Sequence, residues 1–299
     1  MKLSILTPTY NRAELLNRLY HSLLINRNYG VEIEWIIMDD GSTDNTEQLV
    51  HKFQEENNIS IQYYRQQNKG KMAALNQIVN KATGDFILEC DSDDYLTENA
   101  VSILAIQMEK YKDRKDLYAL CFLKKDQNGN NMGQIFSKEE TTMFDLYFKQ
   151  QEKGEKALVF FASIRKKYKY LLEGEEHFST EARMFHQMDQ NYHIVCINET
   201  IMICEYQEDG YTKTILRQFQ QNPNGYYAYF TELFLHDMRG IKFSKRLYIV
   251  KHYILFSVLT QKKNILKPVK GIGNKILIAI LYLPGKILTQ KRFSQKTIK

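Results

Sequence analysis

Strand-like and helix-like segments alternate along the first 94 residues, and this alternation constrains the fold more than any other feature of the chain. Short apolar runs predict strands at residues 3–7, 34–38, 59–63 and 86–88. Apolar residues at helical spacing lie between these runs, at 15–23, 49–53 and 74–82. A β-α-β-α-β-α-β order is typical of a parallel sheet with helices on both faces, so the sequence predicts an α/β fold.

Polar segments follow three of the four apolar runs, at residues 7–11, 39–42 and 91–94. The carboxyl ends of parallel strands meet along one edge of a sheet, and ligands bind there in this class of fold. We therefore expect the three segments to form one site. Asn11, with Glu14 three residues later, is also expected to cap the helix that follows the first strand.

The third polar segment carries three carboxylates, Asp91, Asp93 and Asp94. Close carboxylates repel one another and resist joint ionisation. A divalent cation with hard oxygen ligands would relieve this repulsion, and such cations often bind together with a substrate's phosphates. The alternative is a solvated acidic turn that caps the next helix. The segment alone does not decide between the two.

The sequence contains neither of the two glycine-rich nucleotide-binding motifs, and we expect no signal peptide. It contains no G-x-x-x-x-G-K-[ST], and no G-x-G-x-x-G follows the first strand. A nucleotide would therefore be held through a metal on its phosphates and by side chains at its base. The N-terminal apolar run is too short for a signal peptide. The four cysteines lack metal-ligand spacing, so we expect reduced thiols in a cytosolic protein.

With the three polar segments in this order and spacing, the chain resembles the inverting family-two glycosyltransferases of GT-A fold. That resemblance covers residues 1–210. It implies a catalytic domain over this range, with a nucleotide-sugar half at about 1–96 and an acceptor half at about 97–210. Residues 211–299 are expected to form a basic, amphipathic helical region.

The resemblance also implies which side chains bind the nucleotide sugar, namely Thr7, Pro8, Tyr10, Asp39, Lys71, Asp91 and Ser92. Among them, Asp39 would accept a hydrogen bond from a uracil-type base, and Asp91 would reach the ribose or the sugar. Asp40 is expected to organise the turn rather than bind the ligand. Lys71 is either a cation near the phosphates or a solvated loop lysine.

The resemblance assigns a divalent metal ion to the third polar segment. Asp93 would coordinate Mn²⁺ or Mg²⁺ on the diphosphate, and Asp94 is either a second ligand or a support for Asp93. Such an ion stabilises the negative charge that develops on a leaving nucleoside diphosphate.

Inversion in a single displacement requires a base that accepts the proton of the acceptor hydroxyl group. The family carries an acidic residue before a helix in its acceptor half, and the matching segment here is 173–185. Glu181 is the leading candidate, although it is followed by alanine where the family often has Thr-Glu-Asp. Glu175 and Glu176 remain alternatives, as does a structural capping role for the cluster.

Charge divides the chain into an acidic body and a basic tail. Residues 238–299 contain 15 Lys and Arg but no Asp or Glu, so the net charge of +6 leaves −9 on residues 1–237. The apolar runs at 247–259 and 276–283, the second ended by Pro284, are shorter than the roughly 20 residues of a spanning helix. We expect residues 240–299 to lie on an anionic membrane surface rather than on nucleic acid. Packing on the body or on a second copy is the alternative.

Together these features predict an inverting glycosyltransferase that uses a nucleoside diphosphate sugar, expected to be UDP-linked. The acceptor would be a glycan or lipid-linked molecule in cell-envelope or surface polysaccharide synthesis. The expected location is the cytoplasm, peripherally on the inner face of the cell membrane. The alternatives are a nucleotidyltransferase of similar fold, although residues 4–12 lack its glycine-rich loop, and a non-catalytic nucleotide- or glycan-binding scaffold at the membrane.

Overall fold

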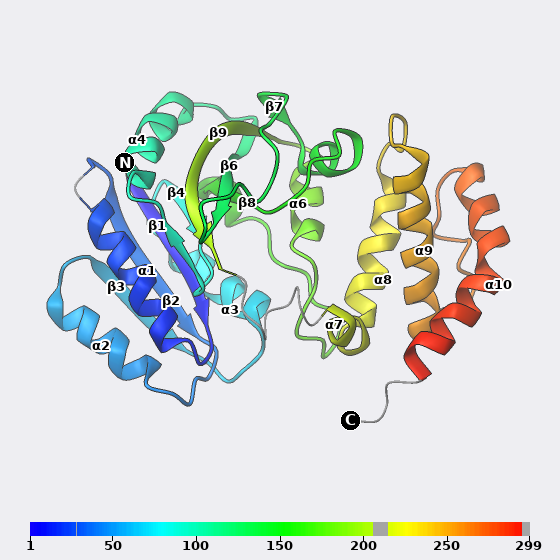
Figure 1. Cartoon of the computed structure of the whole chain (residues 1–299), viewed down its shortest axis with the longest axis horizontal. Coiled ribbons are helices and arrows are strands. Elements are labelled where there is room, and N and C mark those ends of the chain that lie inside the picture. Colours follow the sequence, from blue (N-terminus) through cyan, green and yellow to red (C-terminus); the bar gives the residue numbers. More distant parts are fainter. Residues whose placement is uncertain (28, 206–214, 295–299) are drawn as a thin grey trace. The chain divides into compact units, whose positions relative to one another are not determined.

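The structure, a computed structural model, describes residues 1–27, 29–205 and 215–294. The chain divides into two compact units, both drawn in Figure 1. The first comprises Met1–Tyr170 and Met184–Lys213, and the second comprises Leu171–Arg183 and Thr214–Lys299. The domain boundary expected after residue 210 lies outside the described residues. The segment 171–183, expected within the catalytic domain, clusters with the second unit.

Within the described residues, the first unit contains one sheet of nine strands in the order β3-β2-β1-β4-β8-β6-β9-β5, with β7 paired to β9. The strands are β1 (Lys2–Thr9), β2 (Glu32–Asp39), β3 (Ser60–Arg65), β4 (Phe86–Glu89), β5 (Asp94–Leu96), β6 (Leu117–Asp126), β7 (Glu140–Thr141), β8 (Lys156–Phe161) and β9 (His193–Cys204). Strands β1 to β4 pair in parallel, as do β6 and β9. Strand β8 is antiparallel to both β4 and β6. The sheet is therefore mixed, and its parallel N-terminal part is the one that the sequence predicts.

Helices connect the strands of the first unit, in strict alternation as far as β4. They are α1 (Ala13–Asn26), α2 (Thr46–Glu56), α3 (Lys71–Ile78), α4 (Ala100–Tyr111), α5 (Ala162–Arg165) and α6 (Ala182–Met188), with short turns at Val79–Lys81 and Asp145–Lys149. Every residue of β1 after Lys2 is buried. Burial of consecutive residues requires cover on both faces, as in a parallel sheet with helices on either side.

An aromatic cluster packs α1 and α2 onto β2. The rings of Tyr20 and Phe53 stack at 3.9 Å between centroids, and Trp35 stacks on both at 6.2–6.3 Å. Trp35 is fully buried, and its indole N–H donates a hydrogen bond to the Thr7 hydroxyl group at 2.9 Å. Buried indoles usually find such a partner. The bond ties the middle of β2 to β1, two residues before β1 ends.

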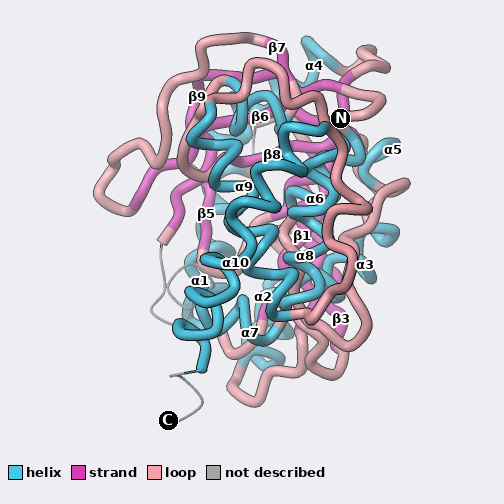
Figure 2. The backbone as a smooth tube through the Cα atoms, turned by 90° about the vertical axis from the view of Figure 1, so that its right-hand side faces the viewer, coloured by secondary structure: helices cyan, strands magenta, loops and turns pink. Residues whose placement is uncertain are grey.

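The second unit is helical in its described part, as expected for a helical C-terminal extension. Its helices are α7 (Ile215–Gln221), α8 (Pro223–Glu232), α9 (Phe243–Leu259) and α10 (Ile272–Ser294), with a short helix at Leu233–Leu235. Helix α9 packs against both α8 and α10 (Figures 1 and 2). The Phe256 ring stacks on Tyr226 and Phe230 of α8 at 4.9 and 5.6 Å. Aromatic packing therefore holds the centre of this unit.

Helix α10 corrects one expectation, because Pro284 does not end it. The helix runs through Pro284 and Gly285 to residue 294. A proline inside a helix removes one backbone hydrogen bond, and here packing on α9 holds the two halves in line. A Cβ atom at Gly285 would lie 2.8 Å from the Ile254 Cγ2 atom, so glycine permits the close approach of the helices. By length and composition alone, α10 is the one helix in the described residues that could cross a membrane.

Candidate active site

The carboxyl ends of β1, β2 and β4 lie side by side. Thr9 is paired in register with Asp39, and the Asp40 N–H donates to the Thr9 carbonyl oxygen at 2.8 Å. On the other side of β1, the Cys90 N–H donates to the Leu6 carbonyl oxygen at 3.0 Å. The three polar segments predicted from the sequence therefore start from one edge of the sheet.

Asp39 is fully buried at this edge, and both of its carboxylate oxygens accept hydrogen bonds. The Ser42 N–H donates to Oδ1 at 2.7 Å, and the Tyr63 hydroxyl group donates to Oδ2 at 2.6 Å. Burial, followed by the charge of Asp39, raises the pKa of Tyr63 far above its ordinary value, so the phenol stays protonated and donates. Tyr63 is a partner of Asp39 that the sequence alone did not indicate.

Asp40 organises the loop before α3, in line with the role expected for it. Its carboxylate oxygens accept the backbone N–H groups of Lys69 and Gly70, each at 2.8 Å. The Gln66 side chain donates to the same carboxylate at 2.6 Å. The loop that leads to Lys71 is thereby held against the end of β2.

The β1 segment presents one exposed aromatic side chain. Tyr10 is 46% exposed, whereas Pro8 is buried behind it. Thr7 is fully buried, and its hydroxyl group accepts the hydrogen bond from Trp35. The Thr7 hydroxyl group is thus hydrogen-bonded within the core, and its contact with a nucleotide stays a prediction.

Asn11 does not cap α1, which is a second correction. Its Oδ1 atom accepts the Thr43 N–H at 2.7 Å, and Asn11 has the left-handed φ of 51°. The first turn of α1 is bonded instead by Asp44, whose Oδ2 atom accepts the Ala13 N–H at 3.2 Å. Because β1 and β2 are neighbours, the loops that follow them satisfy each other's backbone groups across 30 residues of sequence, which local pattern cannot reveal.

Two of the three carboxylates after β4 are paired with lysines. The Lys71 Nζ atom lies 2.7 Å from Asp91 Oδ2, and the Lys124 Nζ atom lies 2.7 Å from Asp94 Oδ2. The structure thus brings Lys71 to the acidic segment, as the sequence suggested. Within the described residues, the Asp93 carboxylate has no cation or side-chain donor of its own. Ser92, between these residues, is buried.

The pKa values separate Asp91 from the other two carboxylates, because burial also raises the pKa of Asp94 and Lys124 does not fully reverse this. Burial raises the pKa of Asp93 to about 6, and the charges of Asp91 and Asp94 add to the rise. Burial alone would also raise the pKa of Asp91. The charges of Lys71 and Lys124 outweigh burial and hold this pKa below its ordinary value. Asp93 differs from both neighbours in its ion pairing, because no lysine or arginine of the described residues pairs with its carboxylate.

Two cations that support the acidic segment were not predicted. Lys124, the last buried residue of strand β6, bonds Asp94 and lies 3.5 Å from Glu155. Burial lowers the pKa of Lys124, but the charges of Asp94 and Glu155 more than reverse this, so the amine remains a cation. Arg18 of α1 donates to the Asp93 carbonyl oxygen at 2.8 Å.

The sequence gives a clearer indication of a special role for Lys124 than for Arg18. A charged residue directly after the apolar run 117–123 marks Lys124 as unusual, since lysine is rarely buried without a partner. Arg18 lies among the leucines of α1, at spacing that any solvent-facing residue of an amphipathic helix could have. Its guanidinium group covers the Tyr95 ring at 4.4 Å and pairs with Glu205.

The segment that holds Glu181 belongs to the second unit. Its acidic residues have different partners. Glu176 accepts hydrogen bonds from the backbone N–H groups of Asn224 and Gly225, each at 2.7 Å, and so caps the start of α8. Arg183 is buried and pairs with Glu173 at 3.0 Å. Glu181 is partly exposed just before α6. Within this segment the cap explains Glu176 structurally, which weakens it as an alternative base.

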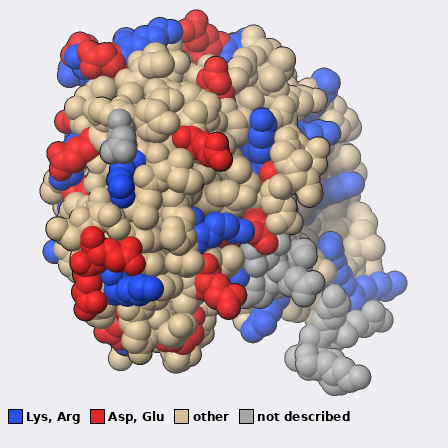
Figure 3. Space-filling model, turned by 60° about the vertical axis from the view of Figure 1, so that its left-hand side comes forward, with Lys and Arg blue, Asp and Glu red and all other residues tan. Residues whose placement is uncertain are grey.

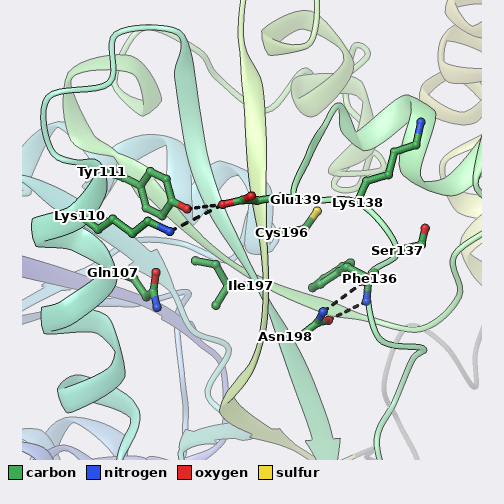
Figure 4. Close-up of a pocket in the computed structure, with 10 residues that line it drawn as sticks. All are labelled: Gln107, Lys110, Tyr111, Phe136, Ser137, Lys138, Glu139, Cys196, Ile197 and Asn198. Atoms are coloured by element: carbon green, nitrogen blue, oxygen red, sulfur yellow. Dashed lines mark hydrogen bonds and ion pairs between the residues drawn. The ribbon is translucent and has the colours of Figure 1, made fainter.

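Figure 4 shows a hollow of about 310 Å³ elsewhere in the first unit, between α4, β9 and residues 136–139. Its polar groups largely pair with one another: Lys110 and the Tyr111 hydroxyl group meet Glu139, and the Asn198 amide bonds the Phe136 backbone. None of the residues that line it belongs to the three strand ends. The hollow is therefore separate from the candidate site.

Among the described residues, no group of three or more His, Cys, Asp or Glu side chains could enclose a metal ion. The site fits a different arrangement, in which the protein supplies a single carboxylate. Asp93 would provide a hard oxygen ligand, since no lysine or arginine of the described residues pairs with it, and phosphate oxygens of a substrate would complete the shell, as is common for Mg²⁺. Asp94 is less suited, because Lys124 already occupies its carboxylate.

Residues 4–170 match the model of a protein family described as Glycosyl transferase family 2. Poly(ribitol-phosphate) beta-N-acetylglucosaminyltransferase TarS of Staphylococcus aureus is 30% identical over 139 residues, which is 46% of this chain and 24% of that protein. GalNAc(5)-diNAcBac-PP-undecaprenol beta-1,3-glucosyltransferase of Campylobacter jejuni is 32% identical over 130 residues, 42% of this chain and 40% of that protein. These matches span less than half the length of each relative.

Solved structures show the same fold. TarS residues 1–349 in complex with UDP-GlcNAc superpose with a TM-score of 0.60 at 16% identity, covering 99% of this chain and 92% of that one. Mannosyltransferase PcManGT of Pyrobaculum calidifontis, in complex with GDP-Man and Mn²⁺, gives a TM-score of 0.57 at 15% identity, covering 96% and 83%. The predicted GT-A fold with a helical C-terminal extension is confirmed.

Proposed function

Because the chain belongs to glycosyl transferase family 2, we propose that it moves a sugar from a nucleoside diphosphate sugar to an acceptor hydroxyl group, with inversion at the sugar carbon. The observation that carries this proposal is the meeting of Tyr10, Asp39 and the Asp91–Asp94 segment at one sheet edge. Matching polar groups at the carboxyl ends of parallel strands suit a nucleotide with its phosphates.

The proposed donor is UDP-linked, and Asp39 is the proposed partner of its base. A carboxylate has about four lone-pair sites, so the two hydrogen bonds from Ser42 and Tyr63 leave acceptor capacity for an imide N–H. Exposed Tyr10 would stack on the base, with Pro8 behind it. Asp91, Ser92 and Lys71 would face the ribose, the sugar and the phosphates, and the Lys71–Asp91 pair sets the spacing of these groups.

A divalent metal ion, Mn²⁺ or Mg²⁺, is the proposed cofactor. When bound, it would neutralise the negative charge that develops on the leaving diphosphate. Asp93 would hold it, and Asp94 would act as a support whose charge is balanced by Lys124. A structure of the same fold in complex with GDP-Man and Mn²⁺ supports this assignment.

Glu181 is the proposed general base. Its carboxylate would accept the proton of the acceptor hydroxyl group while that oxygen forms a bond to the sugar's anomeric carbon. The bond from this carbon to the diphosphate breaks at the same time, and its electron pair leaves with the diphosphate. Attack opposite the leaving group inverts the configuration. The cap formed by Glu176 and the Glu173–Arg183 pair would hold the segment that carries Glu181.

The proposed acceptor is a glycan or a lipid-linked glycan of the cell envelope, reached from the cytoplasmic face of the membrane. The names of the two curated relatives support this: one acts on poly(ribitol-phosphate), and the other on a PP-undecaprenol-linked glycan. An acceptor of either kind would be met at or near a membrane. The basic residues 238–299 supply a surface suited to that location.

Release of UDP from a panel of UDP-sugars, with and without Mn²⁺, tests the proposal. We expect metal-dependent release that Glu181→Gln lowers by about 10²-fold or more, the typical contribution of a positioned base. Glu175→Gln, at an exposed position of the same segment, tests the alternative base: retained activity leaves the role with Glu181, and an equal loss would move it to Glu175. UDP that binds but is never released from a UDP-sugar would support the scaffold alternative, and release of inorganic diphosphate from a nucleoside triphosphate would support the nucleotidyltransferase.

A further inference from the structure

Helix α10 carries a row of exposed apolar side chains along its whole length. Ile272, Ile276, Ile280, Leu283 and Ile287, here called the α10 stripe, recur every three or four residues and so share one side of the helix. Their side chains are 80%, 54%, 66%, 66% and 46% exposed. The stripe is about 22 Å long at 1.5 Å per residue. Five large apolar residues in line are more than the scattered single residues usual on a protein surface.

The opposite side of α10 is the one that packs on α9. Ile278 is fully buried there, Asn274 and Thr289 are buried, and Gly285 adjoins Ile254. The core-facing side of α10 is therefore already satisfied. The stripe is a second apolar side, which the fold of this unit does not use.

Basic residues accompany the stripe. Exposed Lys275, Lys286 and Lys291 lie on α10 itself, and residues 238–299 contain 15 Lys and Arg without one Asp or Glu. Elsewhere, as on the face in Figure 3, acidic and basic side chains are mixed. An anionic surface that also accepts aliphatic side chains satisfies both features, and an anionic lipid bilayer is such a surface.

Two other occupants fit less well. Nucleic acid would pair with the lysines, but it would leave the aliphatic stripe in water. A second copy of the chain would cover the stripe, but a symmetric contact would place the lysines of one α10 beside those of the other. Like charges at such a contact oppose it.

We infer that α10 lies in the plane of an anionic bilayer, with the α10 stripe among the acyl chains and its lysines at the headgroups. A spanning orientation is disfavoured although the helix is long enough, because Lys286 would lie within about 6 Å of the helix midpoint and in the hydrocarbon. Spanning would also strip α9 from the inner side of α10. This inference deepens the proposed function by naming the surface that would bring the enzyme to a membrane-borne acceptor.

Co-sedimentation of the full chain with vesicles tests the inference. We expect binding to phosphatidylcholine vesicles that contain about one-third phosphatidylglycerol, weak binding to pure phosphatidylcholine, and loss in about 0.5 M NaCl because salt screens the headgroup charge. Partitioning should fall about tenfold or more when the stripe is made polar by Ile276→Ser, Ile280→Ser, Leu283→Ser and Ile287→Ser. The matched control removes four equally exposed apolar side chains elsewhere and should bind normally: Ile25→Ser, Ile106→Ser, Ile135→Ser and Leu235→Ser.

The depth of the helix distinguishes lying from spanning. All four native cysteines are buried, so a single cysteine placed at Ile272, Ile280 or Ile287 can be labelled selectively with an environment-sensitive fluorophore. Quenching by brominated lipids should report the same shallow depth at all three positions. A deep middle with shallow ends would overturn the in-plane arrangement.

Several results would contradict the inference, and none of them depends on sugar transfer. Equal binding by the stripe variant and the wild type, or no binding to either vesicle, would refute it. So would a lipid-free dimer that the stripe variant abolishes, because the stripe would then be an interface between copies. Since the vesicle assay needs no donor, its failure would leave UDP release intact, and an inactive enzyme that still binds vesicles would count against the proposed chemistry alone.

Discussion

The Asp93 carboxylate differs from its two neighbours in lacking a cation partner within the described residues. Lysines pair with Asp91 and Asp94, whereas none pairs with the Asp93 carboxylate in the part of the chain that the structure describes. Such a charge is costly without a ligand, as its raised pKa records. Such a loss of folding stability is expected at a cation-binding site, because the bound cation would remove the unfavourable negative charge.

Asp93→Asn should therefore abolish metal-dependent activity and yet stabilise the ligand-free protein. With a folded-state pKa of about 6 against about 3.9 when unfolded, the folded state holds the extra proton between these values. Stability of the wild type is then lost as pH rises through this window. At pH 7 the variant should be more stable by up to about 3 kcal/mol, and near pH 3 the difference should vanish.

Urea unfolding at pH 3, 5 and 7, without metal, measures this effect. Asp113→Asn, at an exposed aspartate, is the control and should change stability by less than about 0.5 kcal/mol. A variant no more stable than the wild type at pH 7 would show that Asp93 is already compensated. The assignment of the metal to Asp93 would then lose its physical basis.

Lys124 should be essential for folding because of Asp94. Lys124→Met leaves Asp94 buried without its cation, a change that costs about 3–5 kcal/mol when one partner of a buried ion pair is removed. The double variant Lys124→Met with Asp94→Asn removes both charges and should recover most of that loss. Thermal or urea unfolding of the four proteins in this cycle gives the coupling, and additive effects would contradict a direct pair.

The sequence predicted which polar strand ends lie together better than it predicted the residues that pack around them. Asp39, Asp91, Asp93 and Lys71 come together as expected, because each follows a strand end or opens the adjoining helix. Tyr63, Lys124 and Arg18 could not be placed from pattern, since they reach the site from other strands or a helix through tertiary contacts. The hydrogen bond between Thr7 and Trp35 was also hidden, because Trp35 lies 28 residues away in the neighbouring strand.

Among the helices and strands, hydrophobic periodicity and the polar, Gly and Pro residues between apolar runs identified the elements of residues 1–94. The same signals gave the wrong helix end at Pro284. A Pro-Gly pair ordinarily marks the end of a helix. In α10 the two residues instead lie at the contact with α9, where the missing Cβ of Gly285 admits Ile254. Packing between two helices thus overrides a local stop signal.

Gly285→Ala should destabilise the second unit. At an exposed site inside a helix, replacing glycine by alanine would stabilise the helix by about 1 kcal/mol. Here the new Cβ would meet Ile254 at 2.8 Å, and overpacking costs about 1–3 kcal/mol. Pro284→Ala, at an exposed neighbour, is the control and should be neutral or stabilising because it restores a backbone donor. Calorimetric unfolding reports both, and a stabilised Gly285→Ala would refute the close contact.

At the scale of the whole molecule, the alternation of strands and helices was enough to predict the α/β class and the edge that carries the site. The later part of the sheet was harder, because β8 enters antiparallel between β4 and β6. The association of residues 171–183 with the C-terminal helices was also hidden. It depends on contacts such as Arg183 with Glu232 at 2.6 Å, across 49 residues of sequence.

The configuration of the first product tests whether this chain transfers sugar from a nucleoside diphosphate with inversion. The protein is incubated with Mn²⁺ and a UDP-sugar whose sugar is α-linked, and the newly formed glycoside or free sugar is followed by proton NMR before mutarotation. For single displacement with Glu181 as the base, we expect the β anomer to form first and Glu181→Gln to slow its formation. Initial formation of the α anomer would contradict the single displacement and the role of Glu181 as its base.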